Sequence, residues 1–358
     1  MKRICVLYLL AVVGCSSAVS GGGAAADPAG TSSSAAVWPV RTRIHLDLWL
    51  HGYAMLLRDS AKVPVFNPGY RDRLQAEKNR RGLNTLLDAN REQLQSRLSI
   101  SPALTNGQFA PLYFGSFDQM RTTIDRFIQA QGDPRAAGDQ AMAQYFAILG
   151  QSFPAAADRE WLRLFTLAVE DERRQFYQEY WTSQNGARLG VVRAADSLWQ
   201  SAYRPRFQGF LNNTQQETGD FLLALTLGGE GRTVNFSARQ NAIAVTMPET
   251  DPLEAIYVFA HEVVNSIVGT AVHDNITPTE QRAGTGAQYA LTGTVRAGAM
   301  LLQRIAPELV TGYTRYYLAQ ARAATTGDIN ARLASTYPLP QGIHDAINRQ
   351  LDVVLGGI

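Results

Sequence analysis

Hydrophobic residues recur at spacings of three and four between about Val37 and Leu227. This spacing is typical of helices that bury one face. It predicts a helix that contains the segment LWLHGYAMLL and further helices over residues 70–98, 117–130, 136–150 and 158–182. Gly132-Asp133-Pro134 and Phe153-Pro154 interrupt the pattern, as turn-forming residues do. The whole region 37–227 is therefore expected to be helical.

The pattern changes between Gly228 and Pro248. Apolar side chains alternate with polar or small ones in TVNFS (233–237) and in NAIAV (241–245). Alternation places every second side chain on one face, so these segments are predicted to be two short strands joined through residues 238–240. Helical spacing resumes at Pro252 and continues to the C-terminus.

These patterns together predict a mainly α-helical fold with a small β-element. We expect a helical region over 37–227, followed by a region over 228–358 that carries the strand pair. A body of about 320 residues is long enough to form one large core or two smaller ones.

The first 14 residues have the zones of an export signal. Lys2 and Arg3 precede an apolar run from Ile4 to Val13, which is too short to span a bilayer as a permanent helix. The run ends in Gly14-Cys15 and resembles the lipobox of bacterial lipoproteins. This resemblance implies that residues 1–14 are removed, that Cys15 is diacylated, and that the exported protein is anchored to a membrane.

The residues after Cys15 support a tethered arrangement. Residues 16–36 are almost entirely Ser, Gly and Ala, a composition that is typical of a flexible tether. The residue after Cys15 is Ser16 rather than an aspartate. This choice resembles the sequence that sorts lipoproteins to the outer membrane in bacteria with two membranes. The other cysteine, Cys5, lies in the predicted signal, so the mature domain has no disulfide and no catalytic thiol.

The charge balance argues against nucleic acid as a partner. The chain has 33 Lys and Arg against 31 Asp and Glu, and removal of residues 1–14 takes away two basic residues and leaves 31 against 31. A neutral protein without a basic block is a poor nucleic-acid binder.

One predicted helix carries polar residues in apolar surroundings. Asp251-Pro252-Leu253-Glu254 is typical of a helix start, and the helix EAIYVFAHEVVNSIVG that follows is apolar almost all round. His261 and Asn265 are four residues apart and share a face, with Glu262 beside them. Burying these groups is costly unless they are paired or bind a metal.

The segment His261-Glu262-Val263-Val264-Asn265 resembles the HExxH zinc helix of zincin metallopeptidases, with asparagine replacing the second histidine. The preceding strand pair also resembles the zincin arrangement, in which an edge strand lies along the substrate cleft. The resemblance implies that His261 binds zinc and that Glu262 is the general base. Asn265, His273 and Glu280 are the candidates that would complete the zinc site, the last of them by similarity to the gluzincin branch; Asp274 is a further candidate.

Three interpretations of this helix remain open. His261 and Glu262 are either hydrogen-bonded core residues, or the remnant of a zincin site in a protein that binds a peptide or partner, or part of a working zinc peptidase of the cell envelope. Thr277-Pro278-Thr279-Glu280 also has the pattern of a helix cap, which gives Glu280 a structural alternative.

Two other groups of polar residues are of interest. His45 and Asp47, on a predicted amphipathic helix, could reach a ligand, although both are also ordinary helix residues. Asp171 and Glu172 lie among arginines and are predicted to form solvated ion pairs.

Overall fold

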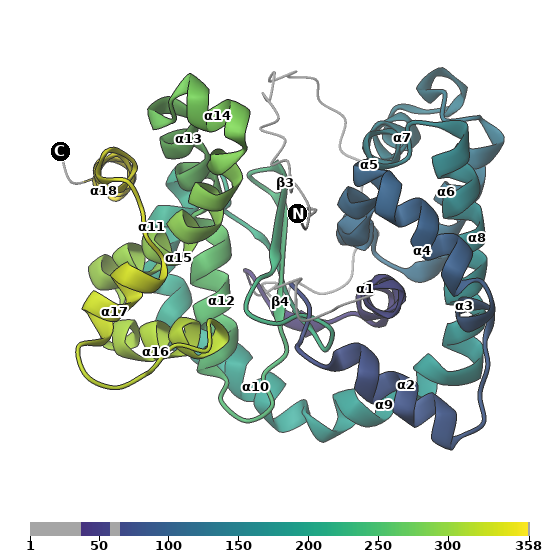
Figure 1. The fold of residues 1–358 in the computed structure, drawn as a ribbon, viewed down its shortest axis with the longest axis horizontal. Helices are drawn as coiled ribbons and strands as arrows, with labels where there is room; N and C mark the ends of the chain where they lie inside the picture. Colours follow the sequence, from purple (N-terminus) through teal and green to yellow (C-terminus); the bar gives the residue numbers. More distant parts are fainter. Residues whose placement is uncertain (1–36, 58–64, 357–358) are drawn as a thin grey trace, which may run out of the picture.

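The computed structural model describes residues 37–57 and 65–356. Helices account for 71% and strands for 8% of the described residues, which confirms the predicted mainly α-helical class with a small β-element. Figure 1 shows the sheet between two groups of helices, one formed by the earlier part of the chain and one formed mostly by the later part.

The sheet has four strands in the order β1-β2-β4-β3. Strands β1 (Val40–Thr42), β2 (Gly219–Ala224) and β4 (Gln240–Thr246) run parallel, and β3 (Arg232–Ser237) pairs antiparallel with β4. The β3–β4 hairpin confirms the predicted strand pair.

Strands β1 and β2 correct the prediction that region 37–227 is wholly helical. The run FLLAL at 221–225 is buried along its whole length, because β2 lies inside the sheet and is covered on both faces. A strand covered on both faces shows a continuous apolar run without alternation, which periodicity does not separate from a buried helix.

The sheet separates two hydrophobic cores. Phe221, Leu223 and Val245 point into the core shared with the later helices, while Leu222 and Ala244 point into the core of the earlier helices. The alternation of neighbouring residues between cores is the two-residue period of a strand. The fold therefore has a three-layer arrangement of helices, sheet and helices.

The earlier helices include the predicted ones, with additional breaks. The segment 70–98 is divided where Gly82 adopts a left-handed φ of 64°. The segment 158–182 is helical throughout and includes a π-helical turn at Arg173–Tyr177. The helices and helical turns before β2 are α1 (Ile44–Leu56), α2 (Tyr70–Arg80), α3 (Leu86–Ala89), α4 (Arg91–Ile100), α5 (Pro102–Asn106), η2 (Gly107–Tyr113), α6 (Phe117–Gln129), η3 (Pro134–Ala136), α7 (Gln140–Ser152), α8 (Ala156–Glu172), η4 (Arg173–Tyr177), α9 (Gln178–Ala187), α10 (Leu189–Leu198), η5 (Trp199–Tyr203) and α11 (Arg204–Asn213).

The helices after β4 cover the other face of the sheet. Part of the chain that precedes β2, including residues of α10, η5 and α11, packs into the same core as these helices. They are α12 (Leu253–Val263), α13 (Asn265–Asn275), α14 (Pro278–Ala283), α15 (Thr285–Ile305), η6 (Pro307–Leu309), α16 (Val310–Gln320), α17 (Ile329–Thr336) and α18 (Gln341–Val354).

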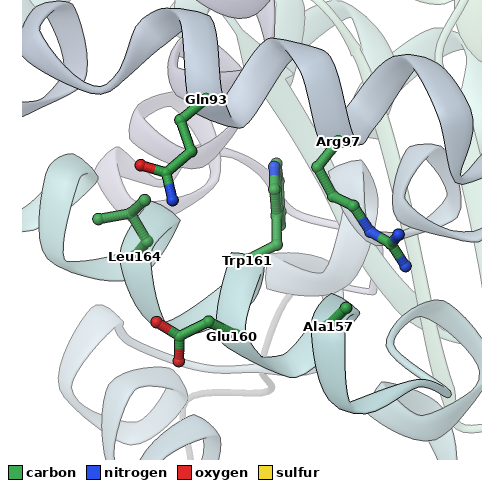
Figure 2. Close-up of a pocket in the computed structure, with 6 residues that line it drawn as sticks. All are labelled: Gln93, Arg97, Ala157, Glu160, Trp161 and Leu164. Atoms are coloured by element: carbon green, nitrogen blue, oxygen red, sulfur yellow. The ribbon is translucent and has the colours of Figure 1, made fainter.

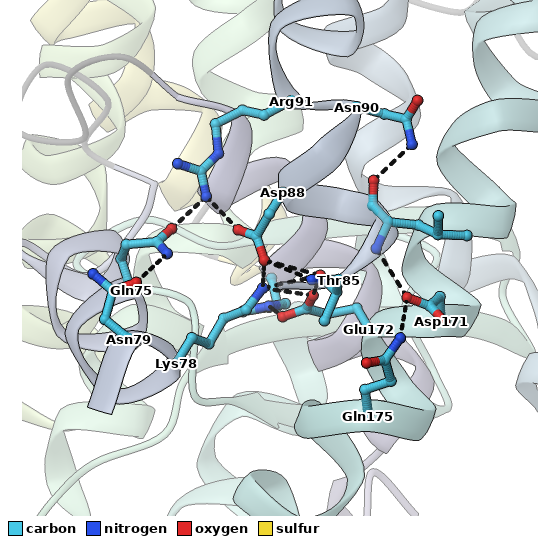
Figure 3. Close-up of polar contacts among 12 residues, drawn as sticks. Gln75, Lys78, Asn79, Thr85, Asp88, Asn90, Arg91, Asp171, Glu172 and Gln175 are labelled. Atoms are coloured by element: carbon cyan, nitrogen blue, oxygen red, sulfur yellow. Dashed lines mark hydrogen bonds and ion pairs between the residues drawn. The ribbon is translucent and has the colours of Figure 1, made fainter. Parts of the chain in front are cut away.

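A buried ionic network joins the earlier helices (Figure 3). Glu172 is fully buried, bonds to His51 at 3.1 Å, and pairs with the equally buried Lys78 at 2.7 Å. The prediction that Glu172 is solvated is therefore wrong. Burial alone would raise the pKa of Glu172, but the bond and charge of His51 and the charge of Lys78 outweigh it and lower the pKa to about 2.

Candidate functional site

The candidate site is built on α12, which follows β4 and begins as the sequence predicts. The Leu253 amide donates to the Asp251 carboxylate at 3.0 Å, so Asp251 caps the helix. The helix ends at Val263, and α13 begins at Asn265, whereas one continuous helix was expected. Residues 253–275 are long and apolar enough to cross a membrane, but 78% of the apolar 18-residue window within them is buried inside the protein, as in a core helix.

Glu262 is the centre of a hydrogen-bond network. Its side chain is 3% exposed. Oε1 accepts from the Gly231 amide at 2.9 Å and lies 2.9 Å from His261 Nδ1, and Oε2 accepts from Asn265 Nδ2 at 3.0 Å. Both carboxylate oxygens therefore have protein partners, one of them a backbone group from the neighbouring loop.

Asn265 is oriented by partners on both sides of its amide. Its nitrogen donates to Glu262, and its Oδ1 lies 3.2 Å from Thr294 Oγ1 on α15, whose single hydroxyl proton is shared between Asn265 and the Ala290 carbonyl at 2.8 Å. The structure thus brings His261, Glu262 and Asn265 together as the sequence predicts. The amide oxygen that could have bound a metal is directed at Thr294.

His261 keeps one ring nitrogen without a partner. Its ring stacks on Tyr317 with centroids 5.2 Å apart and an interplanar angle of 17°. Nδ1 contacts Glu262, while Nε2 has no hydrogen-bond partner among residues 37–57 and 65–356. A carboxylate on one ring nitrogen with the other nitrogen free is also how metal-binding histidines are commonly held.

Glu230 belongs to this site and was not predicted. Its loop is held on both sides, because Tyr317 donates to the Gly229 carbonyl at 3.0 Å and Gly231 donates to Glu262. Burial raises the pKa of Glu230; His261 opposes this shift, and the charge of Glu262 adds to it. The available signal was the sequence Gly-Glu-Gly immediately before a predicted strand.

Gly231 allows the loop to approach the sheet closely. A Cβ at this position would lie 2.1 Å from the Ala244 carbonyl oxygen and 3.1 Å from the Glu262 side chain. Any side chain larger than hydrogen would therefore displace the loop from β4 and weaken the bond from Gly231 to Glu262.

The more distant candidates occupy other surroundings. His273 is 75% exposed and contacts Asp274 at 3.1 Å, near the end of α13. Glu280 completes the capping box of α14 with Thr277 and accepts from Tyr289 at 2.8 Å. Glu280 therefore has the cap geometry that its local sequence pattern indicates.

The residues present do not form a complete zinc site. Structural and catalytic zinc sites use three or four protein ligands. Within the described parts of the chain, no group of three His, Cys, Asp or Glu side chains could hold a metal ion. His261 offers one free nitrogen, whereas the oxygens of Glu262 and Asn265 already accept hydrogen bonds.

Strand β3 lies at one edge of the sheet, beside this network. Thr233 Oγ1 donates to the backbone carbonyl of Glu262 at 3.1 Å, which joins the strand to α12. Phe236 is 43% exposed and packs edge-on against Tyr113, with ring centroids 4.5 Å apart. An edge strand presents backbone groups that can pair with an added strand.

The predicted lipid anchor at Cys15 and the tether at 16–36 lie outside the described residues.

Comparison of the chain with protein-family models, with curated proteins and with solved structures gave no match.

Proposed function

We propose that this protein is a membrane-anchored, zincin-like lipoprotein that binds an extended peptide or partner segment along β3, with the zinc-helix residues serving as a structural network. The observation that carries the proposal is the set of partners around Glu262, whose two oxygens accept from Gly231, His261 and Asn265. A general base needs a lone pair that a water molecule can reach, whereas Oε1 already has two partners, Oε2 has one, and the side chain is 3% exposed.

The position of β3 supports peptide binding in particular. Its order in the sheet leaves one side of β3 without a strand partner among the described residues, and its neighbour β4 leads directly to the Glu262 helix. An extended peptide can add to such an edge by main-chain hydrogen bonds, with its side chains read by flanking residues such as Phe236.

A zinc peptidase is the second candidate, and the free Nε2 of His261 favours it. Zinc content of the purified wild-type protein and of His261→Ala separates the two functions. We expect much less than one zinc per chain in both proteins and no peptidase activity on casein. Stoichiometric zinc in the wild type that is lost in His261→Ala would refute the structural role and establish the metal site.

Peptide binding is tested by selecting random peptides on the wild-type protein and measuring amide hydrogen exchange with an enriched peptide. Protection is expected at residues 232–237, because an added strand bonds to these backbone groups. Protection elsewhere, with unchanged exchange in β3, would contradict the proposed binding edge.

The membrane anchor is tested separately by Cys15→Ser. We expect the wild type to fractionate with membranes and to carry acyl chains on residue 15, and the variant to be released into the soluble fraction. A wild-type protein without acyl chains would contradict this part of the proposal.

A further inference from the structure

Glu230 is a half-buried carboxylate without a partner. Its side chain makes no hydrogen bond and no ion pair with residues 37–57 and 65–356. His261 and Glu262 are the described groups whose charges act on it, and no lysine or arginine is among them. A partly buried charge without a counter-ion costs free energy, so such charges are normally paired. Glu230 therefore keeps a binding capacity that the fold itself does not use.

The loop fixes where this carboxylate lies. Tyr317 on α16 donates to the Gly229 carbonyl, and the Gly231 amide donates to Glu262 on α12. Both bonds are made one residue away from Glu230, and neighbouring Cα atoms are about 3.8 Å apart. The carboxylate is thus attached to a backbone that α12 and α16 hold in place, as a preorganised binding group requires.

His261 is a second group with an unused acceptor at this place. Its side chain is 7% exposed, and its ring stacks on Tyr317, which holds the loop next to Glu230. Because the Glu262 carboxylate accepts hydrogen bonds, the proton of the neutral ring lies on Nδ1, and Nε2 becomes an acceptor. Nε2 has no partner within the described chain and is not closed off from solvent. A buried imidazole with an accessible acceptor indicates a ligand that donates.

The charge around these two acceptors favours a cation. Glu230 and Glu262 bring two carboxylates, and no lysine or arginine of residues 37–57 and 65–356 pairs with either. Tyr337 is also near, because the charge of Glu230 adds to the burial that raises the pKa of this tyrosine to about 12. An ammonium group donates three hydrogen bonds and is attracted by carboxylates and by aromatic rings. It therefore matches the groups present, whereas an anion would be repelled.

One face of β3 is directed to the same side. Thr233 Oγ1 donates to the Glu262 carbonyl, so this face of the strand lies toward α12. Arg232 is on the opposite face, where its guanidinium lies over the Phe109 ring at 5.8 Å. A strand added to β3 alternates its side chains in the same way, so every second residue of a bound peptide is directed to the side of the two acceptors.

Two hollows elsewhere do not present a buried polar group without a partner. Figure 2 shows one of about 160 Å³ over Trp161, between α4 and α8, where Arg97 and Glu160 are both ion-paired. Another, of about 360 Å³, lies where α1 and α6 begin, and Arg173 in its wall is bonded to a nearby glutamine. His45 is also in this wall, but its ring is bonded to a backbone carbonyl, and α1 is buried on every side and is not amphipathic as predicted.

We propose that Glu230 and His261 bind the ammonium group of a lysine side chain in the peptide that adds to β3. Glu230 supplies the opposite charge and accepts one N–H, and Nε2 of His261 accepts another. This inference rests on the proposed function and names the kind of peptide that the edge selects. It gives the two unused acceptors a role that needs no metal ion.

Binding of labelled short peptides to the full chain, measured by fluorescence anisotropy, tests the proposal. The probes alternate threonine and valine, are blocked at both ends, and carry one lysine at each position in turn. The matched set carries norleucine, which keeps the aliphatic part of the side chain without the charge. We expect at least one lysine peptide to bind about tenfold or more tightly than its norleucine counterpart, because a hydrogen bond to a charged group is gained.

Glu230→Gln should remove the advantage of lysine, because the amide keeps the size of the side chain and loses its charge. Glu254→Gln is the matched control, since Glu254 is also a half-buried carboxylate without a hydrogen bond but lies at the start of α12, seven positions before His261. It should leave the lysine preference unchanged. In urea unfolding, the midpoint of Glu230→Gln should be no lower than that of the wild type, since Glu230 has no partner to lose.

Amide hydrogen exchange at 232–237 separates this inference from the function on which it rests. If lysine and norleucine peptides protect β3 and bind equally, the peptide edge stands and the lysine site is refuted. If lysine peptides bind in a manner that depends on Glu230 but do not slow exchange in β3, the lysine site stands and the peptide edge is refuted.

Other results would also overturn the inference. They are absence of binding by every lysine peptide, a lysine preference that persists in Glu230→Gln, an equal loss of that preference in Glu254→Gln, and a lowered unfolding midpoint of Glu230→Gln. Tighter binding of a norleucine peptide with a free N-terminus than of every blocked lysine peptide would assign the acceptors to an α-amino group and would refute the lysine side chain.

Discussion

Replacement of Glu262 by alanine should destabilise the protein strongly if this carboxylate is structural. The substitution removes the acceptor for Gly231, His261 and Asn265 from a side chain that is 3% exposed. Of the three donors, His261 is buried, the Gly231 amide is half-buried and Asn265 is exposed, so water can take the place of the acceptor for Asn265 and in part for Gly231. A buried donor left without a partner costs about 1–3 kcal/mol, and we expect a loss of about 2–4 kcal/mol in the free energy of unfolding.

Glu262→Gln should cost less, about 1 kcal/mol. One oxygen remains to accept from Gly231 and His261, and the new amide group can be accommodated if Asn265 turns its own amide, because the Thr294 hydroxyl can also accept. The order of stabilities is therefore wild type, glutamine variant, alanine variant. A catalytic glutamate predicts otherwise, since active-site residues commonly add little stability.

Urea unfolding of the purified variants, followed by circular dichroism, measures these differences through the midpoint and slope of each transition. Glu254→Ala is the matched control, because Glu254 is on the same helix and has no hydrogen bond to its side chain within the described chain. It should change stability by at most about 1 kcal/mol. If Glu262→Ala unfolds within that margin of the wild type, the structural interpretation is wrong.

Three further outcomes follow from buried groups. Gly231→Ala should lower the free energy of unfolding by about 1–3 kcal/mol, because the new Cβ would clash with the Ala244 carbonyl. Gly190→Ala is the control: its Cβ would have open space, so it should be neutral or stabilising. The midpoints of thermal unfolding of the two variants are compared with that of the wild type. Glu172 has a pKa of about 2 instead of the ordinary 4.5, which contributes about 3 kcal/mol of stability above pH 4.5. This stability should be lost as the pH falls toward 2. In urea titrations at a series of pH values, Glu172→Gln should lack this loss. Burial raises the pKa of Asp47 from 3.8 to about 7, so its effect on stability has the opposite sign. The free energy of unfolding should fall by about 4 kcal/mol as the pH rises from 3.8 to 7, and Asp47→Asn should lack this fall in the same titrations.

Hydrophobic periodicity in the sequence predicted the elements that have one buried face and one exposed face. The β3–β4 hairpin was predictable because β3 has an exposed half, whereas β2 was missed because helices cover both of its faces. Helical spacing correctly placed His261, Glu262 and Asn265 together, because Glu262 contacts residues one position before it and three positions after it, and such contacts are local.

Contacts between distant segments were not accessible in this way. Glu230 and Gly231 reach Glu262 from a loop before β3, and no local period relates them. Lys78 reaches Glu172 across 94 positions, so charge patterning alone presented Glu172 as one of several acidic residues among arginines. Cys15 and its tether stay predictions.

The placement of the sheet between two cores has a consequence for the order of folding. Strand β1 pairs with β2, and Asp47 bonds to Leu225 178 positions further along the chain. The core of the earlier helices is therefore not covered by the sheet until β2 and the β3–β4 hairpin have formed. Bringing together segments so far apart in the sequence is slow. A fragment that stops at residue 227 would expose the inner edge of β2, so the earlier helices depend on the later half of the polypeptide to become a stable unit.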